Sequence, residues 1–220
     1  MKNQQELWYE LNPEITPESL INKVCLSISS DIKQLDLIVE GLLQNKESFN
    51  YQPLFGADIL VSYDWKKLSV VVKSLNQIEE LSLFQWINYL AKIDTIFSPI
   101  LPNGSVIEID GEKISKEVKE IFETDEPGLG FYLQVISRRA TVENSNAYAD
   151  YLTTIWPIGI QPLFQPIPIS NYVIKSVINE GYKNTFEEKY TNALRLESII
   201  NQRHSILFDN LLEATKENES

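Results

Sequence analysis

The spacing of apolar residues changes along this chain, and this change limits the fold more than any other feature. Over residues 16–45 and 76–97, apolar residues recur every three or four positions, which is typical of helices with one buried face. Residues 58–72 instead hold two runs rich in β-branched residues around a turn-like Asp64-Trp65-Lys66-Lys67, which predicts a β-hairpin. Because both patterns occur in one chain, we expect an α+β protein.

The first helical segment should begin at Thr16, which can cap the free backbone amides, with Pro17 in the first turn. It should run to about Asn45, either as one helix or as a pair broken near residues 29–30. The second helical segment, residues 76–97, should end before Pro99, since a residue that precedes proline is disfavoured in the α conformation.

Two prolines within four residues, Pro99 and Pro102, mark the best candidate for a domain boundary, which we place near residue 98. The sequence therefore predicts a helical and hairpin region over residues 1–98 and an α+β domain over residues 99–220.

Residues 105–109, 130–139 and 150–156 have the composition of strands and predict a small antiparallel sheet. Residues 112–125 should form a short surface helix, and the four prolines of 156–168 favour an extended loop or a sheet edge. From Asn184, with Glu187 as a capping partner, helical spacing continues to Leu211. This predicts one long C-terminal helix of about 45 Å, which needs a partner surface either on the N-terminal helices or on another protein.

Composition excludes several classes of function. With 43% apolar residues, 31 acidic against 19 basic residues and a formal net charge of -12, the chain can form a core and should repel nucleic acids and anionic membranes. One Cys and one His cannot make a disulfide or a His/Cys zinc site, so we expect no metal. Neither a signal peptide nor an apolar run of membrane-spanning length is found, which indicates a cytoplasmic protein.

No catalytic or cofactor motif stands out. Glycine-rich nucleotide loops and a Gly-x-Ser-x-Gly motif are missing, and the acidic run at 117–126 lacks the spacing of a calcium loop. We interpret His204 as helix surface and Cys25 as a small buried apolar residue. The chain is therefore expected to be no enzyme and to hold no cofactor, although a carboxylate pair formed in space stays open as an alternative.

Aromatic residues gather around the proline-rich segment, and they have two interpretations: a buried core or a protein-binding patch. On the second interpretation, the binding surface combines these aromatics with apolar positions of the C-terminal helix. The candidate partner-binding residues are Tyr151, Trp156, Phe164, Tyr182, Leu207 and Leu211.

Four short segments of the C-terminal half resemble a known family in the same order. They are Leu-Pro-Asn-Gly-Ser-Val-Ile at 101–107, Val-Ile-Ser-Arg-Arg at 135–139, Asp-Tyr-Leu followed by Trp-Pro-Ile-Gly within 150–159, and a segment at 170–188 that contains Glu-Gly-Tyr. This part of the chain, about residues 100–190, is similar to domain-of-unknown-function family 4176, which is found beside LXG polymorphic toxins in type VII secretion loci of Firmicutes.

The resemblance implies a small cytosolic helper of the toxin. Such a protein would be a chaperone or targeting adaptor that binds the LXG effector before export, and we take this as the functional prediction. The first alternative is an immunity protein that neutralises the toxin, and the second is the enzyme considered above. The expected partner is an LXG effector encoded nearby, and the long C-terminal helix could also support a homodimer.

Overall fold

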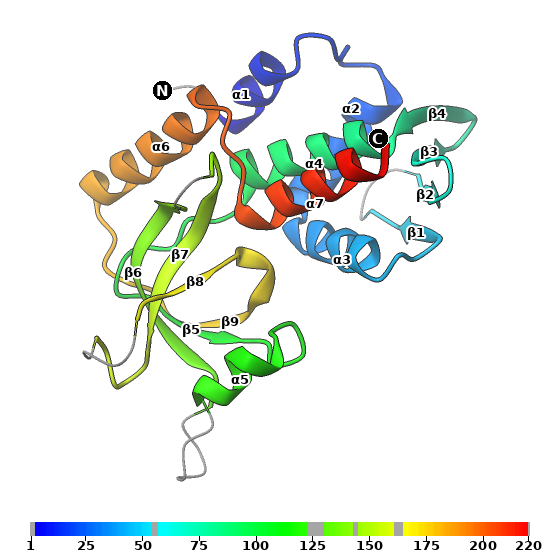
Figure 1. The fold of residues 1–220 in the computed structure, drawn as a ribbon. Coiled ribbons are helices and arrows are strands. Elements are labelled where there is room, and N and C mark those ends of the chain that lie inside the picture. The colour runs from blue at the N-terminus through cyan, green and yellow to red at the C-terminus, as the bar shows by residue number, and fades with distance from the viewer. Residues whose placement is uncertain (1–2, 54–56, 123–129, 143–144, 161–164, 220) are drawn as a thin grey trace. The chain divides into compact units, whose positions relative to one another are not determined.

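The computed structural model describes residues 3–53, 57–122, 130–142, 145–160 and 165–219. These residues form seven α-helices and two antiparallel sheets of four and five strands, so the chain is an α+β protein (Figure 1). The chain divides into two compact units, one of residues 1–98 together with 207–220 and one of residues 99–206. The division after Ser98 lies at the proline-marked position, but the last helix belongs to the first unit and not to the C-terminal domain 99–220 that the sequence predicted.

Helix α4 (Leu83–Phe97) is the centre of the first unit. Helices α1 (Gln4–Leu11), α2 (Leu20–Ser30) and α3 (Ile32–Leu43) all pack against it. Its Trp86, Leu90 and Ile93 are completely buried. The helix starts with a capping box, in which Ser82 and Gln85 satisfy each other's backbone amides at 3.0 and 3.1 Å.

The four-stranded sheet of the first unit has the order β1 (Ser48–Tyr51), β2 (Ile59–Asp64), β3 (Ser69–Ser74) and β4 (Gln77–Ser82). Strands β2 and β3 confirm the predicted hairpin. Val61, Val70 and Val72 are buried, and β3 contacts α2 and α4. Alternating burial along β2 and β3 shows that one face of the sheet supports the helices.

Strand β4 corrects the prediction of a helix over residues 76–97. Leu75 turns the chain with a φ of 50°, and residues 77–82 then pair with β3 along its full length. Ile78 contributed to the apparent helical spacing, but its side chain is exposed, so this spacing did not mark a buried helix face. The helix is confined to Leu83–Phe97.

The first helical segment is the pair that the sequence allowed. Helices α2 and α3 are separated at Asp31, whose backbone leaves the helical conformation with φ -137° and ψ 86°. The start is later than expected: Ser19, not Thr16, accepts the hydrogen bond of the Asn22 amide and caps α2.

The five-stranded sheet of the second unit has the order β8 (Ile167–Ile169), β7 (Tyr148–Ile155), β6 (Tyr132–Thr141), β5 (Val106–Ile109) and β9 (Ile174–Asn179). The three predicted strands correspond to β5, β6 and β7. Strand β8 lies at an edge and includes Pro168, in agreement with the proline argument. Strand β9, at the opposite edge, was not predicted. A short helix, α5 (Lys116–Phe122), and a single 3-10 turn at Asn171–Val173 complete this sheet region.

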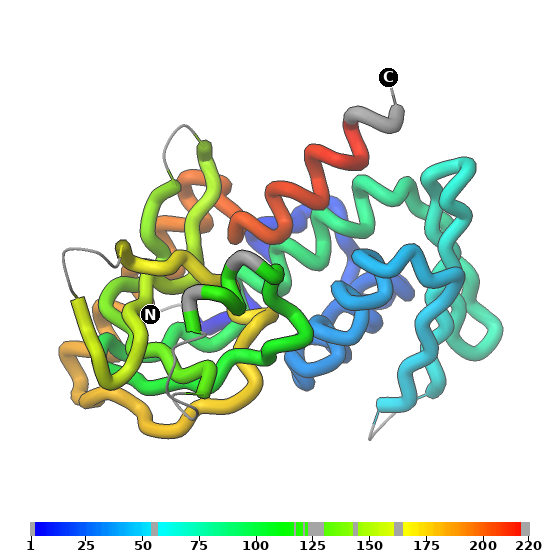
Figure 2. The backbone as a smooth tube through the Cα atoms, turned by 60° about the horizontal axis from the view of Figure 1, so that its bottom comes forward, coloured from blue at the N-terminus to red at the C-terminus, as the bar shows by residue number. Residues whose placement is uncertain are grey.

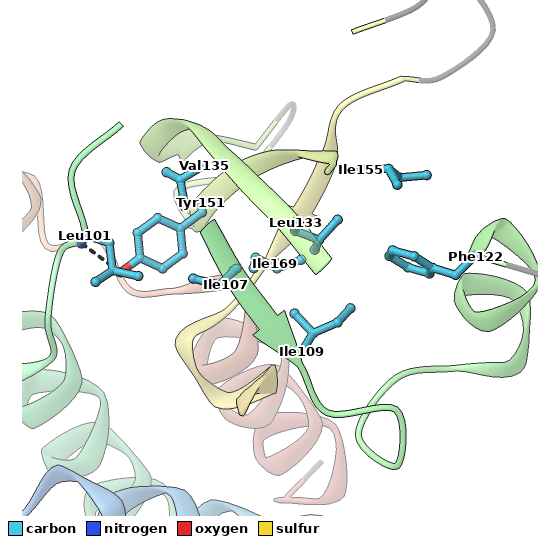
Figure 3. Packing of buried hydrophobic residues seen from close by; sticks show 9 residues of the cluster. All are labelled: Leu101, Ile107, Ile109, Phe122, Leu133, Val135, Tyr151, Ile155 and Ile169. Carbon is cyan, nitrogen blue, oxygen red and sulfur yellow. Dashed lines mark hydrogen bonds between the residues drawn. The ribbon is translucent and has the colours of Figure 1, made fainter. Parts of the chain in front are cut away.

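The core of the second unit is formed by apolar residues from several strands, the loop before β5 and helix α5. Figure 3 shows them: Leu101, Ile107, Ile109, Phe122, Leu133, Val135, Tyr151, Ile155 and Ile169. Val118 of α5 packs against this cluster, so one face of the sheet is covered by its own surface helix.

The prediction of a single long C-terminal helix is wrong. Helix α6 (Thr185–Ile200) ends at Asn201, and α7 (Ile206–Glu219) begins five residues later. Gln202 has a φ of 51°, its amide donates to the carbonyl of Ile199, and the amide of Arg203 donates to that of Ser198. These two bonds form a Schellman motif, which ends a helix even though the residue in the left-handed conformation is not glycine.

Candidate functional site

A pocket of about 610 Å³ lies in the first unit between α3, the β2–β3 turn, α4 and α7. Figures 1 and 2 show α7 beside α4, and Lys216 of α7 lies 5.5 Å from the ring centre of Phe84. We call this cavity the α3–α4–α7 pocket. Its lining residues are Leu42, Asn45, Trp65, Lys66, Leu68, Leu83, Ile87, Leu211, Ala214 and Thr215. Its volume is in the range of roughly 300–1,000 Å³ that is usual for ligand sites.

The β2–β3 turn holds Trp65 at this pocket. The Asp64 carboxylate accepts hydrogen bonds from the amides of Lys66 and Lys67, both at 3.1 Å, and the bond from the Lys67 amide is the main reason why the pKa of Asp64 is lowered. The indole of Trp65 stacks on Tyr63 with ring centres 5.4 Å apart, and its N–H donates to the carbonyl of Lys46 at 3.0 Å. The wall of the pocket is therefore built before any partner binds.

Helix α7 supplies the opposite wall. Phe208, Leu212 and Thr215 are buried, and this stripe at helical spacing attaches the helix to the first unit. Leu211 and Ala214 lie at the pocket. An apolar stripe on α7 with an open space beside it gives a partly covered groove rather than a closed core.

The charge of the pocket is unusual for so acidic a chain. Among the residues that line it, Lys66 is the only charged one, and it is exposed. An apolar floor with one cation at the rim is suited to an apolar group that carries a carboxylate nearby.

The five described partner-binding candidates divide between the two units. Leu207 and Leu211 belong to the first unit, and Leu207 is half-buried beside the buried Phe208. Trp156 and Tyr182 belong to the second unit, and both are exposed. Trp156 packs edge-on against Tyr132, with ring centres 6.3 Å apart. Phe164, the sixth candidate, lies outside the described residues.

Tyr151 is corrected from a partner contact to a core residue. Its side chain is buried, and its hydroxyl accepts a hydrogen bond from the Leu101 amide at 3.1 Å (Figure 3). The hydroxyl oxygen is also 3.0 Å from the carbonyl of Pro99 and from Oδ1 of Asn171, either of which can accept its proton. These contacts join the chain after the boundary to the sheet and leave no surface for a partner.

Cys25 and His204, the two residues considered above for nucleophilic or acid–base chemistry, lie in structural positions. Cys25 is buried, and loss of hydration raises the pKa of its thiol, which suppresses the reactive thiolate. His204 was expected on a helix surface but lies in the link between α6 and α7. Its backbone carbonyl accepts a hydrogen bond from the backbone amide of Tyr148. Within the described ranges, no group of three or more His, Cys, Asp or Glu side chains could hold a metal ion.

Sequence reasoning identified Leu211 but missed the other walls of the α3–α4–α7 pocket. Leu42, Leu83 and Ile87 have ordinary helical spacing and carry no signal of their own. Trp65 did carry a signal of a contact surface, because a hairpin alone cannot cover a large aromatic residue in its four-residue turn.

None of the helices in the described part of the chain is long and apolar enough to cross a membrane. Comparison with known proteins found no matching family model, no similar curated protein and no similar solved structure.

Proposed function

We propose that this protein is a cytoplasmic chaperone or targeting adaptor that binds an LXG effector of a type VII secretion system, and that it is not an enzyme. The observation that supports a binding role is the α3–α4–α7 pocket, an apolar cavity with a polar rim in the first unit. The identity of the partner rests on the resemblance of residues 100–190 to family 4176.

The pocket would receive apolar side chains of the effector. Partner proteins commonly contribute a few anchor residues that fill a preformed cavity, and these anchors carry most of the binding energy. Because Lys66 is the one charged residue of the lining, the anchor should have an acidic residue beside it. At longer range, the net charge of -12 would speed association with a basic toxin domain.

The first experiment is calorimetric titration of the protein with the LXG protein encoded by the adjacent gene. We expect a one-to-one complex that Lys66→Glu and Leu211→Asp each weaken at least tenfold. Lys73→Glu is the matched control, because Lys73 is an exposed lysine of β3 in the same unit and does not line the pocket. Lys66 is exposed, so its substitution should leave the fold intact.

Three results would count against this proposal. If the adjacent gene encodes no LXG protein, or if that protein does not bind, the effector assignment is wrong. If binding occurs but Lys66→Glu behaves like Lys73→Glu, the pocket is not the binding site.

Trp156 and Tyr182 are the candidate contacts of the second unit. Their replacement by alanine should weaken effector binding in the same titration while the circular dichroism spectrum is unchanged, since both side chains are exposed. Unchanged affinity would confine the contact to the first unit.

The immunity role is a second candidate because the excess of 12 acidic over basic residues suits occlusion of a basic active site. Cells that express the toxin domain without any secretion machinery distinguish the two roles. Protection by this protein alone would favour immunity, whereas a complex without protection would favour the chaperone.

A further inference from the structure

Helix α6 turns three large apolar residues outward. Its buried residues are Arg195 and Ser198, whereas the side chains of Phe186, Tyr190 and Ile200 are 76%, 49% and 76% exposed. A helix of a self-contained domain normally turns its apolar side inward. An outward apolar side indicates a contact surface for another molecule.

The exposed residues form one continuous stripe. At 3.6 residues per turn, Phe186, Tyr190, Ala193, Glu197 and Ile200 fall within about 80° of the helix circumference, opposite the buried Arg195. We call these five residues the outer stripe of α6.

The inner side of α6 is fixed to the sheet. Arg138 of β6 forms an ion pair with Glu187, and its second bond, from Nη2 to Oε2, measures 3.1 Å. At the edge of the outer stripe, the ring centre of Tyr190 lies 5.1 Å from the same guanidinium. At the N-terminus of α6, the Asn184 side chain accepts hydrogen bonds from the backbone amides of Phe186 and Glu187 at 3.0 and 2.9 Å. The outer stripe is therefore presented on a capped helix, which lowers the entropy lost on binding.

We propose that the outer stripe binds a second copy of this chain, with α6 packed antiparallel against α6 around Ala193. A two-fold axis through Ala193 places residues at equal distances before and after it opposite each other. Phe186, seven residues before, then faces Ile200, seven residues after. The small side chain of Ala193 lets the two helices approach closely at the centre.

One charge beside the outer stripe and one within it match the same symmetry. Lys189 is four residues before Ala193 and Glu197 is four residues after it, so each lysine of one copy faces a glutamate of the other. Both side chains are exposed, and neither has an ion-pair partner within the part of the chain that the structure describes. On their own helix, no opposite charge stands three or four residues away. A second copy supplies both missing partners at once, which is why we favour it over another protein.

The contact should be weak. A helix of 16 residues is about 24 Å long, and one such pair covers less than the roughly 1,200 Å² that a stable interface usually buries. We therefore expect a monomer at about 1 µM and a dimer that becomes populated at about 100 µM.

Sedimentation equilibrium of the full chain tests this proposal. The mass should rise from 25.3 kDa toward twice that value as the concentration increases. Lys189→Glu and Glu197→Lys should each weaken the dimer by roughly 3–10-fold, because like charges then face each other twice. The double variant K189E/E197K restores opposite charges and should return the affinity to that of the original chain.

Glu188→Lys is the control, since Glu188 is exposed on the same helix but lies away from the outer stripe. A monomer at every concentration would overturn the proposal. A dimer that ignores the single reversals, or that the double reversal fails to restore, would also overturn the α6 contact. Effector binding through Lys66 should be unaffected by Lys189→Glu, so this proposal and the proposed function can fail separately.

Discussion

Replacing Glu187 by alanine should destabilise the second unit by about 2–3 kcal/mol. The Arg138 side chain is only 3% exposed and that of Glu187 is 18% exposed, so the substitution leaves a buried guanidinium without its carboxylate. Breaking a buried ion pair typically costs about 3–5 kcal/mol. Two features should make the loss smaller than this typical cost. Water can reach the site of the lost carboxylate, and Arg138 retains its hydrogen bond to the Thr191 hydroxyl at 3.1 Å and its contact with the ring of Tyr190.

The measurement should report on the second unit alone, because a chain with two compact units is not expected to unfold in a single two-state step. Hydrogen exchange of β6 peptides, followed by mass spectrometry at increasing urea concentration, meets this need. The control is Glu180→Ala, which removes a pair with Lys183 whose side chains are both about half exposed, at 50% and 51%. This control should cost less than about 1 kcal/mol.

A double variant tests the cause of the effect. Arg138→Met with Glu187→Leu removes both charges and should recover most of the stability, since apolar replacement of a buried pair is often neutral or favourable. If Glu187→Ala costs no more than Glu180→Ala, the Arg138 charge is hydrated and the argument from burial is refuted.

Three further predictions concern the second unit. Tyr151→Phe should cost about 1–3 kcal/mol in the same urea experiment, because a buried backbone amide loses its acceptor. Gly181→Ala should cost more than Gly104→Ala in thermal unfolding: a Cβ at Gly181 would collide with the backbone of Asn103, whereas at Gly104, where φ is 85°, it meets nothing within 4 Å and adds only backbone strain. Hydrogen bonds from the side chains of Lys175 and Ser176 lower the pKa of Glu108. The contribution of Glu108 to stability is therefore complete above its unfolded pKa and is lost as the pH falls through the lower folded value. Exchange protection of β9 should therefore drop in acid, and an unchanged protection pattern down to pH 2 would contradict this.

Local chemistry made several elements readable from the sequence. The β-branched runs of residues 58–72 predicted the hairpin, and the proline pair after residue 98 marked the position where the chain passes from one unit to the other. The strands β5, β6 and β7 were also predicted, since strand composition and turn residues act over a few neighbouring positions. The wrong prediction of a helix over residues 76–82 also came from local spacing. Ile78 and Leu81 are three residues apart, which fits an edge strand as well as a helix.

Two features that concern function could not be read from the sequence. The Schellman motif at Gln202 separates α6 from α7, and nothing in the composition of this segment marks it as a helix end. The α3–α4–α7 pocket needs four segments that lie up to 173 residues apart, so no spacing within the chain could reveal it.

The sequence by itself determined the α+β class, the hairpin and strands β5, β6 and β7, because these follow from residue type and near-neighbour spacing. Only the tertiary structure decided that Tyr151 is core, that α7 joins the first unit and that α6 turns Phe186 and Ile200 outward. Burial depends on which surfaces meet in space, and an apolar residue at helical spacing is the same in sequence whether it faces a core or a partner.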